Sequence, residues 1–356
     1  MGGNALKSPS PRLPAPRYFA VVDFVKTEMA KAFPMVRNEI IPAYRHKQDF
    51  GDLDLLVCSC PEYDPFAVAR ALGAKEVVRN GDVTSIGISQ PEGVFQVDLI
   101  KAPSQSFDFA LSYFAWNDMG NLLGRVAHKA GFKLGHQGLM YVVRNPDNPT
   151  HAYGEIPVTH SWLYALNLLG YDTHKYQNIM REGGFESLVD IFRFTVSSRY
   201  VNRGIFLLDN RNATSRVRDA KRPSYTKFLA WLETDEGKAL DPRFDWQERD
   251  SIKAVFLARA FDKFPDFERA HTLAMEKARA DNEFRSKFNG EYVQELTSLT
   301  GKDLGSLIRK FKESFASPDL FRAYVMGATK DDLDEAILQT KRELELEQRA
   351  VQREGA

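Results

Sequence analysis

Gly51-Asp52-Leu53-Asp54-Leu55-Leu56-Val57 is the stretch that decides the fold, because two aspartates stand one residue apart in an otherwise apolar run. In an extended strand, residues i and i+2 point to one face, so Asp52 and Asp54 project together while the leucines between and after them turn into a core. A second run with the same alternation, Val94 to Ile100, carries its one charge at Asp98. Two neighbouring strands would bring the three carboxylates to one spot.

Three clustered carboxylates cannot all stay ionised without a cation. Hard oxygen ligands with open positions suit Mg²⁺ or Mn²⁺, and two such ions are the arrangement used for phosphoryl and nucleotidyl transfer. The sequence therefore predicts that Asp52, Asp54 and Asp98 bind metal and are catalytic. Each aspartate taken alone also fits a solvated strand residue or a turn former.

The segment from Gln105 to Leu134 carries a second pattern, a Tyr-Phe pair followed at fixed spacings by Asp, Asn and Arg. It closely resembles the nucleotide-binding segment of DNA polymerase β and of the wider polymerase β-like nucleotidyltransferase superfamily. In that family the aromatic pair lies against the sugar, the Asp stacks beside the base, the Asn bonds the minor-groove edge of the base, and the Arg faces the templating side. The matching residues here are Tyr113, Phe114, Asp118, Asn121 and Arg125.

The resemblance covers about residues 20 to 205 and is best from Tyr44 to Val143. It makes Asp52, Asp54 and Asp98 the metal-binding triad, with two Mg²⁺ or Mn²⁺ ions. It implies a metal-dependent enzyme that moves a nucleoside monophosphate from an NTP or dNTP to the 3′-hydroxyl of a nucleic acid and releases pyrophosphate.

Arg45 matches a phosphate-contacting Arg of the family, and Gly51 lets the backbone approach a phosphate closely. The chain departs from the family at two places. Ile41-Pro42 replaces a Gly-Ser or Gly-Gly turn that cradles the phosphates, and Trp116 replaces a Gly. Gly2-Gly3-Asn4 offers a substitute for the glycine turn, and the alternative for these residues is a disordered end.

The predicted fold is α+β, a polymerase β-like palm followed by an all-helical C-terminal region. The expected domains are a palm at 1–150, a thumb-like helical segment at 151–205 and a helical acceptor-binding domain at 206–356. Helical spacing takes over after Pro157 and continues to a charged helix around Asp331 to Arg349. The predicted palm elements are helices at Tyr18–Phe33, Pro65–Leu72 and Trp116–Ala130, strands at Leu53–Ser59, Glu76–Arg79, Ser85–Ser89, Val94–Ile100 and Leu139–Val143, and a loop at Arg144–Thr150.

Basic residues gather between Arg203 and Lys227, interleaved with Phe206, Tyr225 and Phe228. Basic residues mixed with aromatics suit phosphate contacts and base stacking, which predicts a nucleic-acid-binding segment. The same composition also fits a solvated helix face or a salt-bridge cluster that packs domains together. The residues predicted to contact nucleic acid are Arg211, Arg216, Arg218, Lys221 and Arg222.

The stretch from Tyr292 to Lys312 places Leu304, Leu307, Ile308 and Phe311 on one helical face behind Gly301 and Gly305. Over some twenty residues it resembles the tail of bacterial-type tRNA nucleotidyltransferases, which favours an RNA end as acceptor over DNA. The Tyr113-Phe114 pair favours DNA, because in the family it tends to exclude a ribose hydroxyl. The alternatives are therefore a polymerase β-type gap-filling repair enzyme, although no lyase domain is expected before the palm, and a non-catalytic nucleic-acid-binding protein.

Composition fits a cytoplasmic enzyme with free thiols. The chain has 356 residues, 43% of them hydrophobic, and 48 basic residues balance 48 acidic ones. No apolar run reaches membrane length, and the first residues lack the apolar stretch of a secretory signal. Cys58 and Cys60 are too close for an unstrained bridge and too few for a structural zinc site. The sequence leaves open which nucleotide is added, how many, whether a template is needed, and the oligomeric state.

Overall fold

The computed structural model describes residues 3–145, 148, 150–239 and 244–354. The chain forms two compact units, the first made of Met1–Val142 and Glu155–Ala270 and the second of Val143–Gly154 and His271–Ala356. This division differs from the segments expected at 1–150, 151–205 and 206–356. The reason is one shared core, in which Leu122 and Leu139 pack with residues as distant as Phe256.

A five-stranded sheet forms one half of the first unit. Its order is β2-β4-β7-β6-β5, and β4 and β7 are its parallel pair. The strands are β2 (Asn38–Ile40), β4 (Asp52–Cys58), β5 (Glu76–Asn80), β6 (Val83–Gln90) and β7 (Gly93–Ala102). The four sheet strands predicted before residue 105 are confirmed. A two-residue ladder beside it, β1 (Leu13–Pro14) on β3 (Asp49–Phe50), was not predicted.

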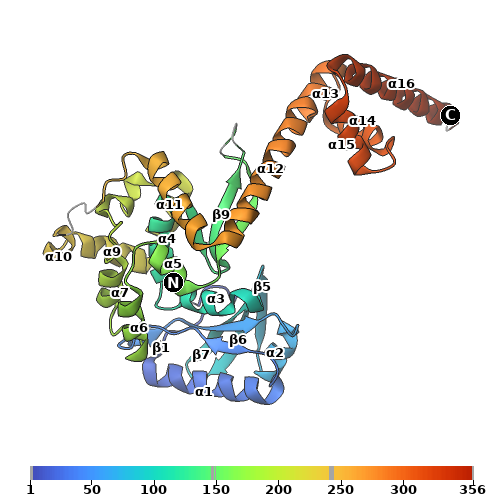
Figure 1. Ribbon diagram of the computed structural model, residues 1–356. Helices are drawn as coiled ribbons and strands as arrows, with labels where there is room; N and C mark the ends of the chain where they lie inside the picture. The colour runs from blue at the N-terminus through green and yellow to red at the C-terminus, as the bar shows by residue number, and fades with distance from the viewer. Residues whose placement is uncertain (1–2, 146–147, 149, 240–243, 355–356) are drawn as a thin grey trace. The chain divides into compact units, whose positions relative to one another are not determined.

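Helices α1 (Ala15–Ala32) and α2 (Pro65–Ala71) cover one face of this sheet (Figure 1). In α1 the buried residues recur at helical spacing, Tyr18, Val21, Val22, Val25 and Met29, and the helix ends before Pro34, which cannot continue it. They meet Leu53, Leu55 and Val97, none of which has exposed surface. The alternation of β4 and β7 thus puts their leucines and valines into the core, as predicted.

Helix α3 (Phe107–Phe114), preceded by a 3₁₀ turn η1 (Ser104–Ser106), covers the opposite face, where Leu56 and Cys58 pack on Phe107 and Ala110. The next helix, α4, spans Met119–Lys129. The sequence predicted one helix from Trp116 to Ala130. The helix begins only at Met119, because Trp116 and Asn117 have left-handed backbone angles, with φ of 62° and 60°, which are incompatible with a right-handed α-helix.

Three further strands follow α4 in the order β10-β9-β8. They are β8 (Phe132–Gly135), β9 (Gly138–Arg144) and β10 (Ala152–Thr159). The sequence predicts β9 but not β10, because its apolar residues recur at helical spacing soon after Pro157. A proline is tolerated in an edge strand, and β10 is at the edge. The predicted loop at Arg144–Thr150 includes 146, 147 and 149, which lie outside the described residues.

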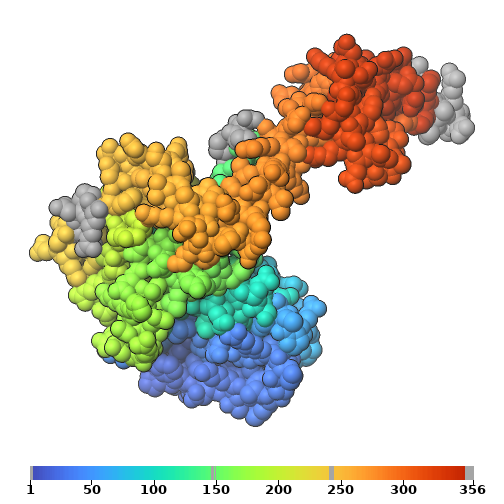
Figure 2. All heavy atoms as spheres, viewed as in Figure 1, coloured from blue at the N-terminus to red at the C-terminus, as the bar shows by residue number. Residues whose placement is uncertain are grey.

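The rest of the first unit is helical and shares its core with α4. In the space-filling view the green and yellow-green atoms of this part adjoin the blue and cyan atoms of the five-stranded sheet and its helices (Figure 2). The elements are α5 (Trp162–Leu168), α6 (Thr173–Arg181), α7 (Leu188–Thr195), η2 (Arg203–Ile205), η3 (Leu208–Asn210), α8 (Ala213–Ala220), α9 (Pro223–Leu232), α10 (Asp235–Lys238) and α11 (Arg249–Lys263).

The second unit has its own core of Phe288, Leu307, Phe311, Phe321 and neighbouring apolar side chains. The apolar face predicted for Leu304 to Phe311 is confirmed, because Leu307 and Phe311 are buried and Leu304 and Ile308 pack against them. Its helices are α12 (Pro265–Lys287), of which the residues up to Ala270 belong to the first unit, α13 (Gly290–Thr297), α14 (Gly301–Glu313), α15 (Pro318–Gly327) and α16 (Lys330–Glu354). None of the described helices is long and apolar enough to span a membrane.

Candidate active site

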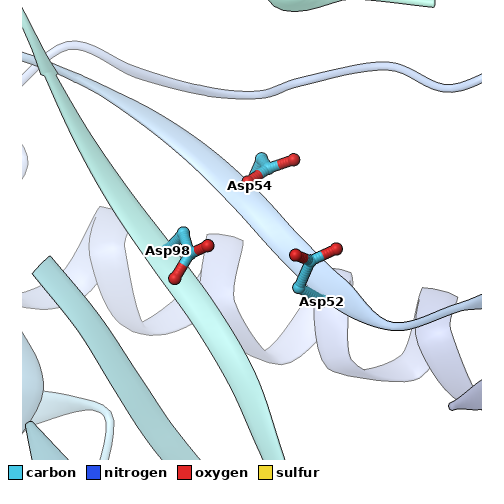
Figure 3. A group of neighbouring side chains, drawn as sticks. All are labelled: Asp52, Asp54 and Asp98. Atoms are coloured by element: carbon cyan, nitrogen blue, oxygen red, sulfur yellow. The ribbon is translucent and has the colours of Figure 1, made fainter. Parts of the chain in front are cut away.

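The three predicted aspartates meet on adjacent strands. Asp52 and Asp54 project from the same side of β4, and Asp98 projects beside them from β7 (Figure 3). Parallel pairing puts Asp54 opposite Asp98 and Asp52 opposite Gln96. One carboxylate oxygen from each aspartate lies within 4.8 Å of the other two. Among the described residues, this is the cluster of Asp, Glu, His or Cys side chains whose spacing could hold a metal ion.

Burial and mutual repulsion make this triad hard to ionise. Burial, followed by the charges of Asp52 and Asp98, raises the pKa of Asp54 to about 8. Burial also raises the pKa of Asp98, although hydrogen bonds from Ser85 and Gln96 oppose the shift. Three hard oxygen ligands that repel one another fit a divalent cation such as Mg²⁺ or Mn²⁺, because its charge would offset both the burial and the repulsion.

Lys47 is a cation beside the triad that the sequence analysis missed. Its pKa is lowered by burial, while the carboxylates of Asp52 and Asp54 act in the opposite direction. Its Nζ lies 4.5 Å from the centre of the Phe50 ring and forms no ion pair with any described residue. No spacing rule could have found it, because the turn that carries Lys47 back toward β4 is not visible in the local pattern.

Gln96 is the second residue that was missed. It is 2% exposed, and its Nε2 donates hydrogen bonds to both carboxylate oxygens of Asp98, at 2.9 and 3.0 Å. A signal was present, because Gln96 stands two residues before Asp98 on a predicted strand and must share its face.

Ile41-Pro42 connects the triad to the aromatic pair. The Ile41 amide donates to the Asp54 carbonyl at 2.9 Å, and the Trp116 amide donates to the Pro42 carbonyl at 2.8 Å. The C-terminal end of α3, which carries Tyr113 and Phe114, is therefore held at the edge of β4 next to Asp54. The sequence had marked Ile41-Pro42 only as a departure from a glycine turn.

Trp116 fits its unusual position because a glycine faces it. Its φ of 62° belongs to the left-handed region that favours glycine. The indole lies against Gly184, where a Cβ would overlap the ring, and packs edge to face on Phe185 at 5.6 Å between ring centres. The replacement of a family Gly by Trp is thus matched by Gly184 in the loop before α7.

Asp118, Asn121 and Arg125 lie along α4 as predicted, with Asp118 at its N-cap. Asn121 Nδ2 and Arg125 Nε are buried and have no hydrogen-bond partner among the described residues. Burial, then the charge of Arg211, lowers the pKa of Arg125 to about 10. Asp118 accepts a hydrogen bond from Arg222 at 3.1 Å, so the basic segment reaches the residues expected to hold the base.

The basic segment has a buried half and an exposed half, and this corrects the prediction for Arg211. The Arg211 side chain has no exposed surface, pairs with the equally buried Asp219, and donates to the Tyr225 hydroxyl at 2.8 Å. Phe206, Tyr225 and Phe228 are also fully buried, so they pack a core and do not present faces to bases. Arg211 therefore fits the alternative of a salt-bridge cluster that packs parts of the chain together. The other residues predicted to contact nucleic acid differ from it, since Arg216, Arg218 and Lys221 are exposed and Arg222 is half-buried.

Arg45 and Gly51 have partners other than those expected. Arg45 is exposed and forms an ion pair with Glu186, lining a cavity of about 260 Å³ whose described lining residues do not include the triad. Gly51 is buried, and its carbonyl accepts from the Ser10 hydroxyl at 3.3 Å. Gly3 donates its backbone N–H to Asp52 Oδ2 at 3.2 Å, while Gly2 lies outside the described residues.

A scan of the sequence against protein-family models finds no match, and a search of curated proteins finds no relative.

Proposed function

We propose that this protein is a metal-dependent nucleotidyltransferase with a polymerase β-like palm, which transfers a nucleoside monophosphate from an NTP or dNTP to the 3′-hydroxyl of a nucleic acid. The observation that carries the proposal is the triad of Asp52, Asp54 and Asp98, whose ligand oxygens lie within 4.8 Å of one another on adjacent parallel strands. The link through Ile41-Pro42 supports it, because it holds the aromatic pair at the same strand edge.

Each side chain has a role that follows from its position. Asp52, Asp54 and Asp98 would together hold two Mg²⁺ or Mn²⁺ ions. When bound, such ions lower the pKa of an attacking hydroxyl and neutralise charge on a triphosphate. Lys47 provides a partly buried positive charge beside the carboxylates, which favours an anionic substrate over a neutral one.

Tyr113, Phe114, Asp118 and Asn121 would hold the sugar and base. The unpartnered Nδ2 of Asn121 supports this assignment, because a buried donor without a partner costs about 1–3 kcal/mol and a base edge offers acceptors. Arg222 is a further candidate for the base, since it pairs with Asp118.

An RNA end is the favoured acceptor. Its phosphates would contact the exposed side chains of Arg216 and Arg218 in α8 and of Lys221 at the C-cap of this helix. The second unit carries the stretch that resembles tRNA nucleotidyltransferase tails, with its apolar face in a core. A gap-filling DNA polymerase is the alternative and becomes one outcome of the assay below.

The assay incubates the protein with labelled NTPs or dNTPs and with RNA ends, DNA ends and gapped duplexes, with and without Mg²⁺. We expect Mg²⁺-dependent incorporation that falls by more than about 100-fold in Asp52→Asn and Asp98→Ala, because each removes a ligand of the reacting ions. Asp23→Asn, an exposed aspartate on the outer side of α1, is the matched control. Turnover that survives excess chelator, or full activity in either triad variant, would refute the proposal.

A further inference from the structure

Residues 3–12, called the N-terminal strap here, run across the strands that carry the triad and donate backbone amides to their side chains. The Gly3 amide donates to Asp52 Oδ2 at 3.2 Å on β4, and the Ala5 amide donates to Gln96 Oε1 at 2.9 Å on β7. The amides of Lys7 and Ser8 both donate to the Glu76 carboxylate on β5. The strap therefore contacts three strands of the sheet through main-chain donors.

Gln96 connects the strap to the third aspartate. Its amide oxygen accepts from Ala5, so its Nε2 must face Asp98, where it donates to both carboxylate oxygens. At 2% exposure the side chain has no water to replace either partner. Loss of the strap contact would free Gln96 to turn, and of its two side-chain hydrogen-bond partners Asp98 would then keep only Ser85.

Gly3 is at the one place in the strap where glycine is required. Its φ is +83°, and a Cβ there would lie 2.5 Å from the Gly51 carbonyl oxygen and 3.0 Å from Ser10 Cβ. Ser10 holds the same part of the strap on the sheet. Its hydroxyl donates to the Gly51 carbonyl at 3.3 Å and accepts from the backbone N–H of Gln96 at 3.0 Å. Leu6 is 8% exposed, so its buried side chain adds a hydrophobic contact that holds the strap on the protein.

We propose that the N-terminal strap is a positioning element of the metal site, which orients Asp52 through the Gly3 amide and Asp98 through Gln96. Each carboxylate oxygen has two lone pairs, so Asp52 keeps acceptor positions for an ion while the Gly3 amide fixes its plane. Outer hydrogen-bond partners of this kind change metal affinity by about 10–100-fold when they are removed. The inference rests on the proposed function, because it needs the triad to bind a divalent ion.

The test measures Mn²⁺ affinity of the full chain by electron paramagnetic resonance of free Mn²⁺, independently of any assay of transfer. The variants are Gly3→Ala, which displaces the strap, Gln96→Met, which keeps the volume but removes the hydrogen bonds, and Ser10→Ala, the mildest change. Gly73→Ala is the matched control, since Gly73 also has positive φ, +64°, but its Cβ would meet nothing within 4 Å. The thermal midpoint without metal reports on folding of each variant.

We expect Gly3→Ala and Gln96→Met to weaken Mn²⁺ binding by about 10–100-fold and Gly73→Ala to leave it unchanged. Unchanged affinity in Gly3→Ala, Gln96→Met and Ser10→Ala, where these variants remain folded and transfer by the parent is still Mg²⁺-dependent, overturns the strap inference alone. Tighter Mn²⁺ binding in Gly3→Ala also overturns it, because the strap would then block the site. A parent chain that binds no Mn²⁺ overturns both this inference and the proposed function.

Discussion

Asp219 and Asp54 show how its surroundings decide the ionisation of an aspartate side chain. Asp219 has no exposed surface, and its negative charge is matched by the equally buried Arg211. Asp54 is half-buried beside two further carboxylates, and its pKa is raised instead. In the first arrangement the charge has its counter-charge within the protein, whereas in the second the carboxylates repel one another, and a cation would offset that repulsion.

The raised pKa of Asp54 predicts a pH-dependent stability of the metal-free protein. Burial and its acidic neighbours raise the pKa to about 8 in the folded state, against about 3.9 in the unfolded chain. Between these values the folded state holds a proton that the unfolded state has lost, so stability should fall as pH rises from about 4 to about 8. Thermal midpoints of the parent and Asp54→Asn from pH 5 to 8.5, without metal, measure this.

We expect Asp54→Asn to lose this contribution to the pH slope and to be more stable than the parent at pH 8.5. Adding Mn²⁺ should raise the parent's midpoint most at the alkaline end, because metal binding displaces the proton. If the thermal midpoints of parent and variant depend on pH in the same way, the raised pKa of Asp54 in the folded state is contradicted.

The buried ion pair predicts an unequal cost of two neighbouring substitutions. Asp219→Asn leaves the Arg211 charge buried without a counter-charge, which should lower the free energy of unfolding by about 3–5 kcal/mol. Arg218 also pairs with Asp219 but its side chain is 52% exposed, so Arg218→Gln should cost about 0–1 kcal/mol. Urea denaturation of both variants measures the two changes in the free energy of unfolding. Equal changes would argue against an ion pair between Arg211 and Asp219 that is fully buried.

At the level of elements, α8 and α9 divide the basic segment into buried and exposed residues. Arg211 and Tyr225 face inward, where they lie near Arg125, and Arg222 reaches Asp118. Arg216, Arg218 and Lys221 stay exposed. The same segment therefore contacts Asp118 and Arg125, two of the residues expected at the nucleotide, and also carries exposed positive charges.

This division predicts which arginines govern RNA binding. Replacing Arg216, Arg218 and Lys221 together by Gln should weaken RNA binding and reduce the salt dependence, with each lost contact to a single strand lowering the log–log slope by about 0.7. The control changes Lys26, Arg70 and Lys75 to Gln, three exposed cations outside this segment. Equal slopes for the two triple variants would assign RNA binding to another surface, and a strong preference for gapped DNA would favour the polymerase alternative.

Local periodicity predicted some of these features and was unable to predict others. The alternation of β4 and β7 placed the aspartates on one face, since a strand fixes the direction of every second side chain. The burial of Arg211 depends on partners that helical or strand spacing does not reveal, namely Asp219, Tyr225 and the distant Arg125. The strap and Lys47 were missed for the same reason, because their partners lie on strands that are distant in sequence or reached through a turn.

For the whole molecule, the separate cores of the two units predict two unfolding events. Leu307 is fully buried in the core of the second unit, whereas the triad belongs to the first. Leu307→Ala should cost about 2–5 kcal/mol and lower one calorimetric transition only. Mn²⁺ should raise the other transition only. A single transition that responds to both changes would mean that the units unfold cooperatively.

The contact between the Gly3 amide and Asp52 has a practical consequence for protein production. An affinity tag fused to the N-terminus would be attached close to the carboxylates, and a polyhistidine tag would add competing ligands for divalent metals there. Residual tag residues after cleavage would remain in the same place. The contact with Asp52 therefore argues against an N-terminal purification handle in metal titrations.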